Sequence, residues 1–385
     1  MSEDLRRSRI AVAAAFATQG GIFISLTTRL PDFADKWHLS DAELSGLLLM
    51  MVLLAGVGSL AAEGLARRVE SARLLRHGLV LIGLGVLLIG LAPGLPFFIG
   101  AMAVYGVGLG VVDATTNMQA VALEHRYARP ILPSFHGAWT LGGLFGSAIT
   151  LSTSSLPLQT VGVLVVVPLV LAPCGRFLRR VGDPVADGPK VDVPWRPILL
   201  VGLGMVVFYM VDTAAFTWGP TYLDHAFDAP GELVALATFP YLAASGVLRL
   251  SGDALVTRFG ATPVLRIGAL VGCAGLAVVV FAPVWPVAVL GFLIVGGGVA
   301  VVAPLSFSAA ARIAGEGTED AALRQARVDT VIGRFNQFNY LGALVGAVLT
   351  GLIGSGDLRI GFAVPMVLVL ALLPLARAFA PARRA

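Results

Sequence analysis

Long uncharged runs dominate the pattern of hydrophobic and polar positions along the chain. No Asp, Glu, Lys or Arg occurs from Gly78 to Val112, from Gly137 to Gly175 or from Ile267 to Ala311. A helix needs about 20 apolar residues to cross a bilayer, so each run is long enough for two crossings. Turn residues interrupt each run near its middle, at 92–96, 152–157 and 282–286. The pattern therefore predicts pairs of transmembrane helices joined by tight hairpins, because lipid-facing strands would alternate instead.

The same criteria predict twelve spans over the whole chain. They lie at about 10–31, 43–64, 74–92, 96–121, 132–153, 157–177, 197–223, 231–255, 262–282, 285–310, 329–352 and 359–380. The longest connection, residues 176–196, is polar and contains Pro and Gly. We therefore expect an N-terminal six-helix bundle at 1–176, a cytoplasmic linker at 177–196 and a C-terminal six-helix bundle at 197–385.

Composition and charge agree with this pattern and add an orientation. The chain is 57% hydrophobic and 13% charged, against about 25% charged in soluble proteins. With both termini in the cytoplasm, all of the 27 Lys and Arg except Arg29, Lys36 and Arg359 fall on the cytoplasmic side. This predicts a multi-pass protein of the cytoplasmic (inner) membrane, with no removable signal peptide and no nucleic-acid partner. Cys174 and Cys273 are expected to be free thiols.

The two halves resemble each other in sequence. Residues 65–78 lie over 255–268 at a constant offset of 190, and five residues are identical: Leu65, Arg68, Leu75, Arg76 and Gly78 match Leu255, Arg258, Leu265, Arg266 and Gly268. A separate shift of 193 places Asp212 over Gln19. Parallel six-span repeats of this kind are typical of alternating-access transporters.

Polar side chains occur in some spans and not in others. The central stretches of spans three, six, nine and twelve, at 78–92, 161–173, 267–282 and 361–376, have no strongly polar side chain, and these spans are expected to face lipid. Spans one, four, five, seven and eleven carry Gln19, Asp113, Asn117, Gln119, His136, Asp212, Asn336, Gln337 and Asn339. Because polar groups in hydrocarbon are costly unless they are paired or wetted, we expect these helices to surround a water-accessible central cavity.

Several segments resemble the major facilitator superfamily. The basic segment "GDALVTRFGATPVLR" at 252–266 is similar to its loop motif, whereas "TTRLPDF", "GLGVVDATTNMQA", "SFHGAWTLGGLFGS" and "DTAAFTWGPTYL" resemble its fucose-permease-like branch. The resemblance implies an all-α integral membrane fold of twelve transmembrane helices in two pseudo-symmetric six-helix bundles, working as a monomer. It also implies that Arg249, Asp253 and Arg258 form a gating latch on the cytoplasmic side. The alternative is that these residues only contribute to the charge asymmetry between cytoplasmic and external loops.

The first-half counterpart of this latch departs from the family pattern. Arg67 occupies the usual acidic position and Glu70 replaces the following glycine. Glu63 offers a carboxylate one turn earlier, and Arg68 is the basic counterpart of Arg258. We therefore assign gating roles to Glu63 and Arg68 as well.

Two carboxylates within the spans are candidates for proton coupling. Gly106, Gly110, Asp113 and Asn117 form one stripe of a helix. Asp113 is interpreted as a proton-titratable group, because charged residues inside membranes are usually functional. The alternative is a structural Asp, with the glycines present for close helix packing. Asp212 is a second proton site, a ligand for solute hydroxyls or a structural acceptor.

The candidate solute-binding residues are amides, a histidine and aromatic rings: Gln19, Asn117, Gln119, His136, Trp139, Trp218, Tyr222, Asn336, Asn339 and Tyr340. Amides beside an aromatic ring suit a neutral, hydroxyl-rich solute. The alternatives are interhelical hydrogen bonds for the amides, anchoring at the membrane interface for Trp218 and Tyr222, and a proton relay or a loop contact for His136.

Enzyme motifs are absent from the sequence. It has no G-x-x-x-x-G-K-[ST] loop, no H-E-x-x-H pair and no cluster of Cys and His, so no enzyme activity, cofactor or metal is expected. The sequence predicts a secondary active transporter that moves a small polar, sugar-like solute and protons across the lipid bilayer by alternating access, most simply as a proton symporter. The alternatives are a proton-coupled exporter of drugs or metabolites and a non-transporting membrane receptor or scaffold.

Overall fold

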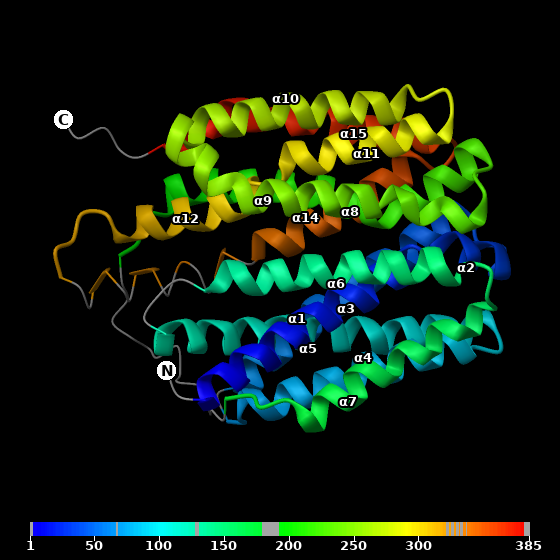
Figure 1. The fold of residues 1–385 in the computed structure, drawn as a ribbon, viewed down its shortest axis with the longest axis horizontal. Coiled ribbons are helices and arrows are strands. Elements are labelled where there is room, and N and C mark those ends of the chain that lie inside the picture. Colours follow the sequence, from blue (N-terminus) through cyan, green and yellow to red (C-terminus); the bar gives the residue numbers. More distant parts are fainter. Residues whose placement is uncertain are drawn as a thin grey trace. The chain divides into compact units, whose positions relative to one another are not determined.

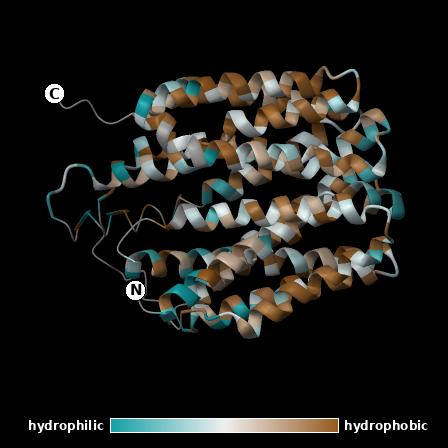
Figure 2. Ribbon diagram, viewed as in Figure 1, coloured by the Kyte–Doolittle hydropathy of each residue, from teal (hydrophilic) through white to brown (hydrophobic). Residues whose placement is uncertain are grey.

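The structure is a computed structural model that describes residues 3–66, 68–127, 131–178, 192–320, 323–324, 327–328, 331, 334–335 and 337–380 (Figure 1). Within these residues, nine helices are long and apolar enough to cross a membrane, and Leu158–Cys174 and Gln337–Ile353 are shorter apolar helical segments. Apolar residues follow the length of the helices in Figure 2. The chain is a multi-pass, all-helical membrane protein.

Each predicted span overlaps a described helix or a run of consecutive helices. The first half contains α1 (Glu3–Thr27), α2 (Leu30–Trp37), α3 (Asp41–Ala66), α4 (Ser71–Leu91), α5 (Leu95–Tyr127), α6 (Leu132–Thr153), η1 (Leu158–Val165) and α7 (Val166–Cys174). The second contains α8 (Trp195–Phe227), η2 (Gly231–Ala237), α9 (Phe239–Phe259), α10 (Ala261–Val280), α11 (Trp285–Val299), α12 (Val302–Gly315), α14 (Gln337–Ile353), α15 (Leu358–Leu368), η3 (Val369–Ala371), α16 (Leu372–Leu375) and η4 (Ala376–Phe379).

The short helix α2 was not expected from the hydropathy pattern. It follows Arg29, whose side chain is only 5% exposed although the residue was counted among the charges outside the membrane. The guanidinium donates to Asp32 at 2.7 Å and to the Ser154 carbonyl at 2.9 Å. The guanidinium therefore binds carbonyl groups that have no intrahelical partner at the end of α6. These bonds explain how the charge of Arg29 can be buried.

Contacts divide the chain into two compact units, Met1–Pro184 with Pro230–Ala235, and Val185–Ala229 with Leu236–Ala385. In the first unit α1 packs on α6, α3 and α4 pack on α5, and α4 packs on η1 and α7. In the second unit α8 packs on α14, α9 and α10 pack on α11, and α10 packs on α15. Corresponding spans pair in the same way in both units, so the internal repeat is present in the packing as well as in the sequence.

Close helix contacts define the register of this repeat. A Cβ on Gly106 would lie 2.8 Å from the Met51 carbonyl oxygen, and one on Gly296 would lie 2.2 Å from that of Tyr241. Gly296 and Tyr241 are each 190 residues after Gly106 and Met51, so the two contacts are equivalent in the repeat. The glycines of α6 and α14 contact α1 and α8, and these contacts give a different offset between α1 and α8.

A Cβ on Gly142 would meet the carbonyl of Ala17, and one on Gly342 would meet that of Val206. The α1 and α8 positions in these contacts differ by 189, and the helices α6 and α14 end 200 residues apart, at Thr153 and Ile353. The shift of 193 is therefore wrong, and Asp212 corresponds to Phe23 rather than to Gln19. A difference of four residues preserves the helix face, so the incorrect shift still paired residues on corresponding faces of the two helices.

Arginine side chains also repeat. Arg76 Nε donates to the Ala172 carbonyl at 3.0 Å, and Arg266 Nε donates to the Leu373 carbonyl at 3.2 Å. Each guanidinium binds a carbonyl near the end of the last span of its unit, where a positive charge is favourable. Some of the basic residues that give the chain its orientation signal therefore also cap helices.

Large apolar side chains are exposed on the predicted lipid-facing spans, including Val163, Ile267 and Val367. They are also exposed on other helices, including Val57 of α3 and Phe145 of α6. Apolar exposure therefore does not single out every third helix. Cys174 and Cys273 are free, as expected.

Candidate functional site

The glycine stripe of α5 brings that helix against α3 in the first unit. A Cβ on Gly110 would lie 1.7 Å from the Ala55 carbonyl oxygen, so no larger residue fits without separating the helices. The glycines therefore allow close helix packing, as the structural alternative for this stripe proposed. Asp113 lies about one turn further along α5, is half-buried and interacts electrostatically with Glu63 of α3. The amide of Asn117 donates to the Asp113 backbone carbonyl at 2.9 Å.

A second group of candidate residues lies along α1 and α6. The ring of Phe16 is 5.5 Å from His136, and that of Phe23 is 6.3 Å from Trp139, measured between centroids. Gln19 shares the helix face of the two phenylalanines, at i+3 from Phe16. It is 5% exposed, and no donor among the described residues reaches its Oε1 atom. This leaves a buried acceptor beside aromatic rings.

In the second unit, Asp212 is 6% exposed and accepts a hydrogen bond from the hydroxyl of Tyr241 at 2.7 Å. The Tyr241 ring is fully buried and meets Phe216 edge to face, with centroids 5.2 Å apart. Tyr241 was missed at the sequence level, although it lies two turns before Arg249 on the same face of α9. Ser245 lies between them, and its buried Oγ has no hydrogen-bond partner among the described residues.

Arg249 was assigned to the gating latch, and the structure places it near Asp212. Its Nε donates to the Ala300 carbonyl at 3.2 Å, and its guanidinium lies 5.6 Å from the centroid of Phe208. Phe208 is one turn before Asp212 on α8, and the Arg249 charge acts on the Asp212 carboxylate. A carboxylate, a phenol and a guanidinium therefore come together inside this unit.

Three candidate solute-binding side chains use their polar groups within the helix packing. The amide of Gln119 donates to Ser71 Oγ at 2.7 Å and to the Leu178 carbonyl at 2.9 Å, and it accepts from the Leu178 N–H at 2.8 Å. Trp218 Nε1 donates to the Ala347 carbonyl at 2.7 Å, and the Tyr222 hydroxyl donates to the Val279 carbonyl at 2.7 Å. All three side chains are fully buried.

The full burial of Trp218 and Tyr222 argues against the alternative that they anchor the chain at the membrane interface, because an anchor needs one exposed polar end. In the remaining set, Asn339 and Tyr340 are half-buried in the first turn of α14. Glu63, Arg68 and Arg258 are exposed. The Asn336 assignment and the Asp253 side chain lie outside the described residues, as does Arg67.

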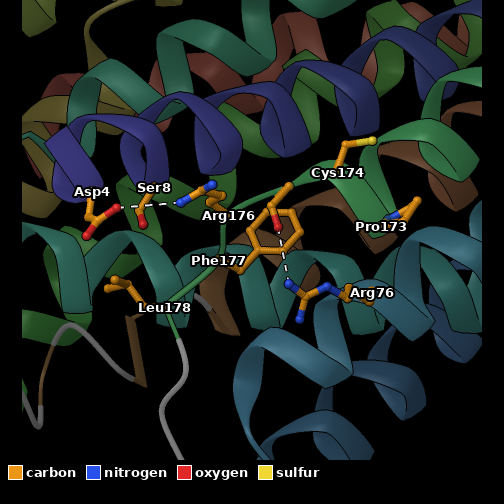
Figure 3. A pocket seen from close by; sticks show the side chains of 9 residues that line it. Asp4, Ser8, Arg76, Pro173, Cys174, Arg176, Phe177 and Leu178 are labelled. Carbon is orange, nitrogen blue, oxygen red and sulfur yellow. Dashed lines mark hydrogen bonds and ion pairs between the residues drawn. The ribbon is translucent and has the colours of Figure 1, made fainter.

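A groove of about 660 Å³ lies in the first unit (Figure 3). Its lining comes from the start of α1, from α4 and from the end of α7. In Figure 3 Arg176 pairs with Asp4 at 3.6 Å, and Arg76 donates to the Gly175 carbonyl at 3.2 Å. These contacts join the end of α7 to its neighbours. None of the predicted solute-binding residues lines the groove.

Comparison with known proteins points to one family of transporters. The family model described as "Major Facilitator Superfamily" matches residues 201–385. The chain is 27% identical over 382 residues to an uncharacterised MFS-type transporter of Yersinia pestis, covering 96% of this chain and 95% of the relative. The chain is thus similar to the major facilitator superfamily, in its second half by the family model and along nearly its whole length by this relative. It is also 28% identical over 309 residues to an uncharacterised transporter of Sinorhizobium fredii, covering 78% of this chain and 81% of that relative.

Solved structures of the superfamily share the fold. A variant of the nucleoside transporter NupG superposes with a TM-score of 0.71 at 13% identity, covering 98% of this chain and 99% of that one. The Escherichia coli fucose:proton symporter FucP superposes with a TM-score of 0.59 at 15% identity, covering 97% and 98%. The chain is a transporter and not an enzyme, as the sequence predicted. Its place in the fucose-permease-like branch stays a prediction.

Proposed function

We propose that this transporter moves a small, polar, sugar-like solute across the cytoplasmic membrane by alternating access, as a proton symporter. The observation that carries the proposal is the buried carboxamide of Gln19, whose Oε1 has no donor among the described residues. A buried acceptor without a donor is costly. A hydroxyl of a bound solute would satisfy it without bringing a charge into the membrane.

The surroundings of Gln19 support a ring-shaped solute. The half-buried rings of Phe23 and Trp139 offer apolar faces near the amide. Gln119, Trp218 and Tyr222 are left out of the proposed site, because their polar groups are already bonded to protein atoms. Among the similar structures, NupG transports nucleosides and FucP transports fucose with protons.

Asp113 and Asp212 are proposed to couple solute movement to protons. A carboxylate that is shielded from water is stabilised as the neutral acid, whereas access to water stabilises the anion. Alternating access changes this exposure during each cycle, so the proton affinity of such a group changes with it. That change would allow a proton gradient to drive solute accumulation.

The purified protein tests this function directly. Thermal unfolding would be measured with a panel of hexoses, nucleosides and cationic drugs, and any solute that stabilises the protein would be used in proteoliposomes. We expect a sugar or nucleoside to accumulate when the outside is more acidic, and a Gln19→Leu variant to bind it much more weakly. Accumulation that ignores the pH gradient would exclude proton symport, and stabilisation by cationic drugs alone would favour export.

A further inference from the structure

The groove of Figure 3 lies where α1 and α4 begin and α7 ends, all within the first unit. Its charged lining residues are Asp4, Arg76 and Arg176, one carboxylate and two guanidiniums, so the lining carries a net positive charge. Ser8 of α1 adds a hydroxyl, and Phe177 adds an apolar ring. The lining therefore suits a ligand that has an anionic group beside an apolar part.

Arg76 supplies a positive charge that the packing holds in place. Its half-buried guanidinium donates to the carbonyls of Ala172 at 3.0 Å, Gly175 at 3.2 Å and Ala72 at 3.4 Å. A guanidinium has five N–H donors, so these three bonds leave two of them available. Among the described residues no carboxylate pairs with Arg76. The groove thus contains a fixed cation whose charge is not neutralised by the protein there.

Arg176 supplies a second positive charge, and this one is held loosely. It pairs with Asp4 at 3.6 Å, and the two side chains are 62% and 86% exposed. Ion pairs between exposed side chains contribute little to stability. A phosphate group binds arginine more strongly than a neutral acceptor does, through short charge-assisted hydrogen bonds. Arg176 can therefore exchange Asp4 for a phosphate that is bound beside Arg76.

An apolar stripe on α7 leads into the groove. Val167, Val170 and Cys174 are spaced i, i+3 and i+7, so they share one face of the helix. The two valines are 50% and 56% exposed, and Cys174 is exposed and lines the groove. In a protein that spans a membrane, exposed apolar side chains contact the acyl chains of lipids. A lipid chain that lies along this stripe therefore places its headgroup at the groove.

We propose that the groove binds an anionic phospholipid, with Arg76 and Arg176 as the counter-charges of its phosphate and the stripe on α7 as the surface for one acyl chain. In the predicted orientation this end of the unit is cytoplasmic, and basic pockets between transmembrane helices on that side suit anionic headgroups. The bound phosphate joins α4 to the segment that follows α7. This lipid site is distinct from the proposed solute site and does not depend on protons.

The internal repeat separates the capping role of Arg76 from its role in the groove. Arg266, its counterpart in the second unit, donates to the Leu373 carbonyl at 3.2 Å in the same way. Arg266 is not among the residues that line the groove. A variant of Arg266 therefore loses an equivalent cap without touching the lipid site, and it is the matched control for a variant of Arg76.

Native mass spectrometry of the purified, delipidated transporter measures binding without a known solute. The probe is an equimolar mixture of phosphatidylglycerol and phosphatidylcholine with the same acyl chains. Both lipids contain a phosphate, but only phosphatidylglycerol has a net negative charge. We expect its adduct to exceed that of phosphatidylcholine at least about fivefold, since each arginine near the membrane surface favours anionic lipid by about that factor.

Three variants test the assignment of the arginines. Arg176→Gln should lower the preference for phosphatidylglycerol about fivefold, Arg76→Gln should lower it at least as much, and Arg266→Gln should keep the wild-type value. Equal adducts of the two lipids on the wild type would overturn the proposal. If Arg76→Gln does not fold, the exposed Arg176 decides: an Arg176→Gln preference equal to that of Arg266→Gln would overturn the proposal as well.

The thiol of Cys174 locates the lipid. A bulky maleimide attached to Cys174 fills the groove, so the labelled wild type should lose its preference for phosphatidylglycerol. In Cys174→Ala only Cys273 of the second unit can react, and the same treatment should leave the preference intact. A preference that survives labelling of Cys174 would show that the lipid binds elsewhere and would reject the groove.

A soluble phosphate ester is the other source of the same chemistry. Glycerol 3-phosphate in large excess should leave the phosphatidylglycerol adduct unchanged, because it has no acyl chain to cover the stripe on α7. Displacement of the lipid by glycerol 3-phosphate would overturn the lipid assignment in favour of a soluble ligand. None of these measurements uses the transported solute, so their outcome stays separate from the test of proton symport.

Discussion

Replacing Tyr241 by Phe is expected to destabilise the protein, because it removes the 2.7 Å hydrogen bond to a carboxylate that is 6% exposed. The ring stays, so its edge-to-face contact with Phe216 is retained. Leaving a buried acceptor without its donor costs about 1–3 kcal/mol, and more when the group is charged. At about 2–4 °C per kcal/mol for a folded unit of 150–250 residues, the thermal midpoint should fall by at least about 2 °C.

Two other tyrosines provide matched controls for the same chemical change. The Tyr222 hydroxyl donates to a backbone carbonyl, Val279, at 2.7 Å. Tyr222→Phe should therefore cost about 1 kcal/mol, the usual net value of a neutral hydrogen bond. The fully buried hydroxyl of Tyr105 has no hydrogen-bond partner among the described residues. Tyr105→Phe should leave the midpoint unchanged or raise it, because it removes a polar group that gains nothing from burial.

The assay is thermal unfolding of the purified variants in detergent at fixed protein concentration, followed by the tryptophan fluorescence of the protein. We expect the midpoints to rank as Tyr105→Phe, Tyr222→Phe and Tyr241→Phe, from highest to lowest. A Tyr241→Phe midpoint equal to that of the wild type would refute the reasoning, since it would mean that Asp212 does not depend on the hydroxyl. A large loss in Tyr105→Phe would show that the ring substitution itself is harmful.

Three further predictions concern coupling, packing and topology. Asp113→Asn should abolish solute accumulation driven by a pH gradient and spare counterflow exchange, because Asn resembles the protonated acid but cannot release a proton. Solute accumulation at the wild-type level in liposomes would show that Asp113 has a structural role. Gly110→Ala should sharply lower the yield of folded protein, because its Cβ would lie 1.7 Å from a carbonyl oxygen of α3. Gly137→Ala should be tolerated, because no atom lies within 4 Å of the new Cβ. Equal yields of the two variants in size-exclusion chromatography would contradict the close packing at Gly110. A cysteine introduced at position 185 of a variant without Cys174 and Cys273 should react with membrane-impermeant reagents only after cells are opened, and labelling of intact cells would reverse the orientation.

The helix pattern could be predicted from the sequence because lipid selects long apolar runs regardless of their partners. The unbroken run from Gly78 to Val112 therefore predicted two helices and a hairpin, and α4 and α5 confirm this. Helix α2 escaped prediction because it is too short to span a membrane, and the buried charge of Arg29 before it depends on the contact with the end of α6. Such a contact joins residues more than a hundred positions apart and leaves no periodic signal.

The candidate site was predicted less completely, because hydropathy shows that a polar residue is unusual without showing which way it faces. Asp212 and Gln19 were identified as exceptional, but Tyr241 was not, because a tyrosine is unremarkable in an apolar helix until its hydroxyl meets a carboxylate. Trp218 and Gln119 stand out in the sequence as solute-binding residues would, as side chains with polar groups within apolar spans. In the structure their polar groups are instead hydrogen-bonded to neighbouring parts of the protein. Packing direction separates these cases, and it comes from the tertiary structure.

The arginine contacts at the ends of α7 and α16 have a consequence for the order in which the chain assembles. Arg76 precedes its carbonyl partner Ala172 by 96 residues, and Arg266 precedes Leu373 by 107. At about 5–20 residues per second, a ribosome makes each partner roughly 5–20 s after its arginine. Neither bundle can complete this contact until its sixth span has been synthesised. Translation therefore sets the earliest time at which each of these contacts can form.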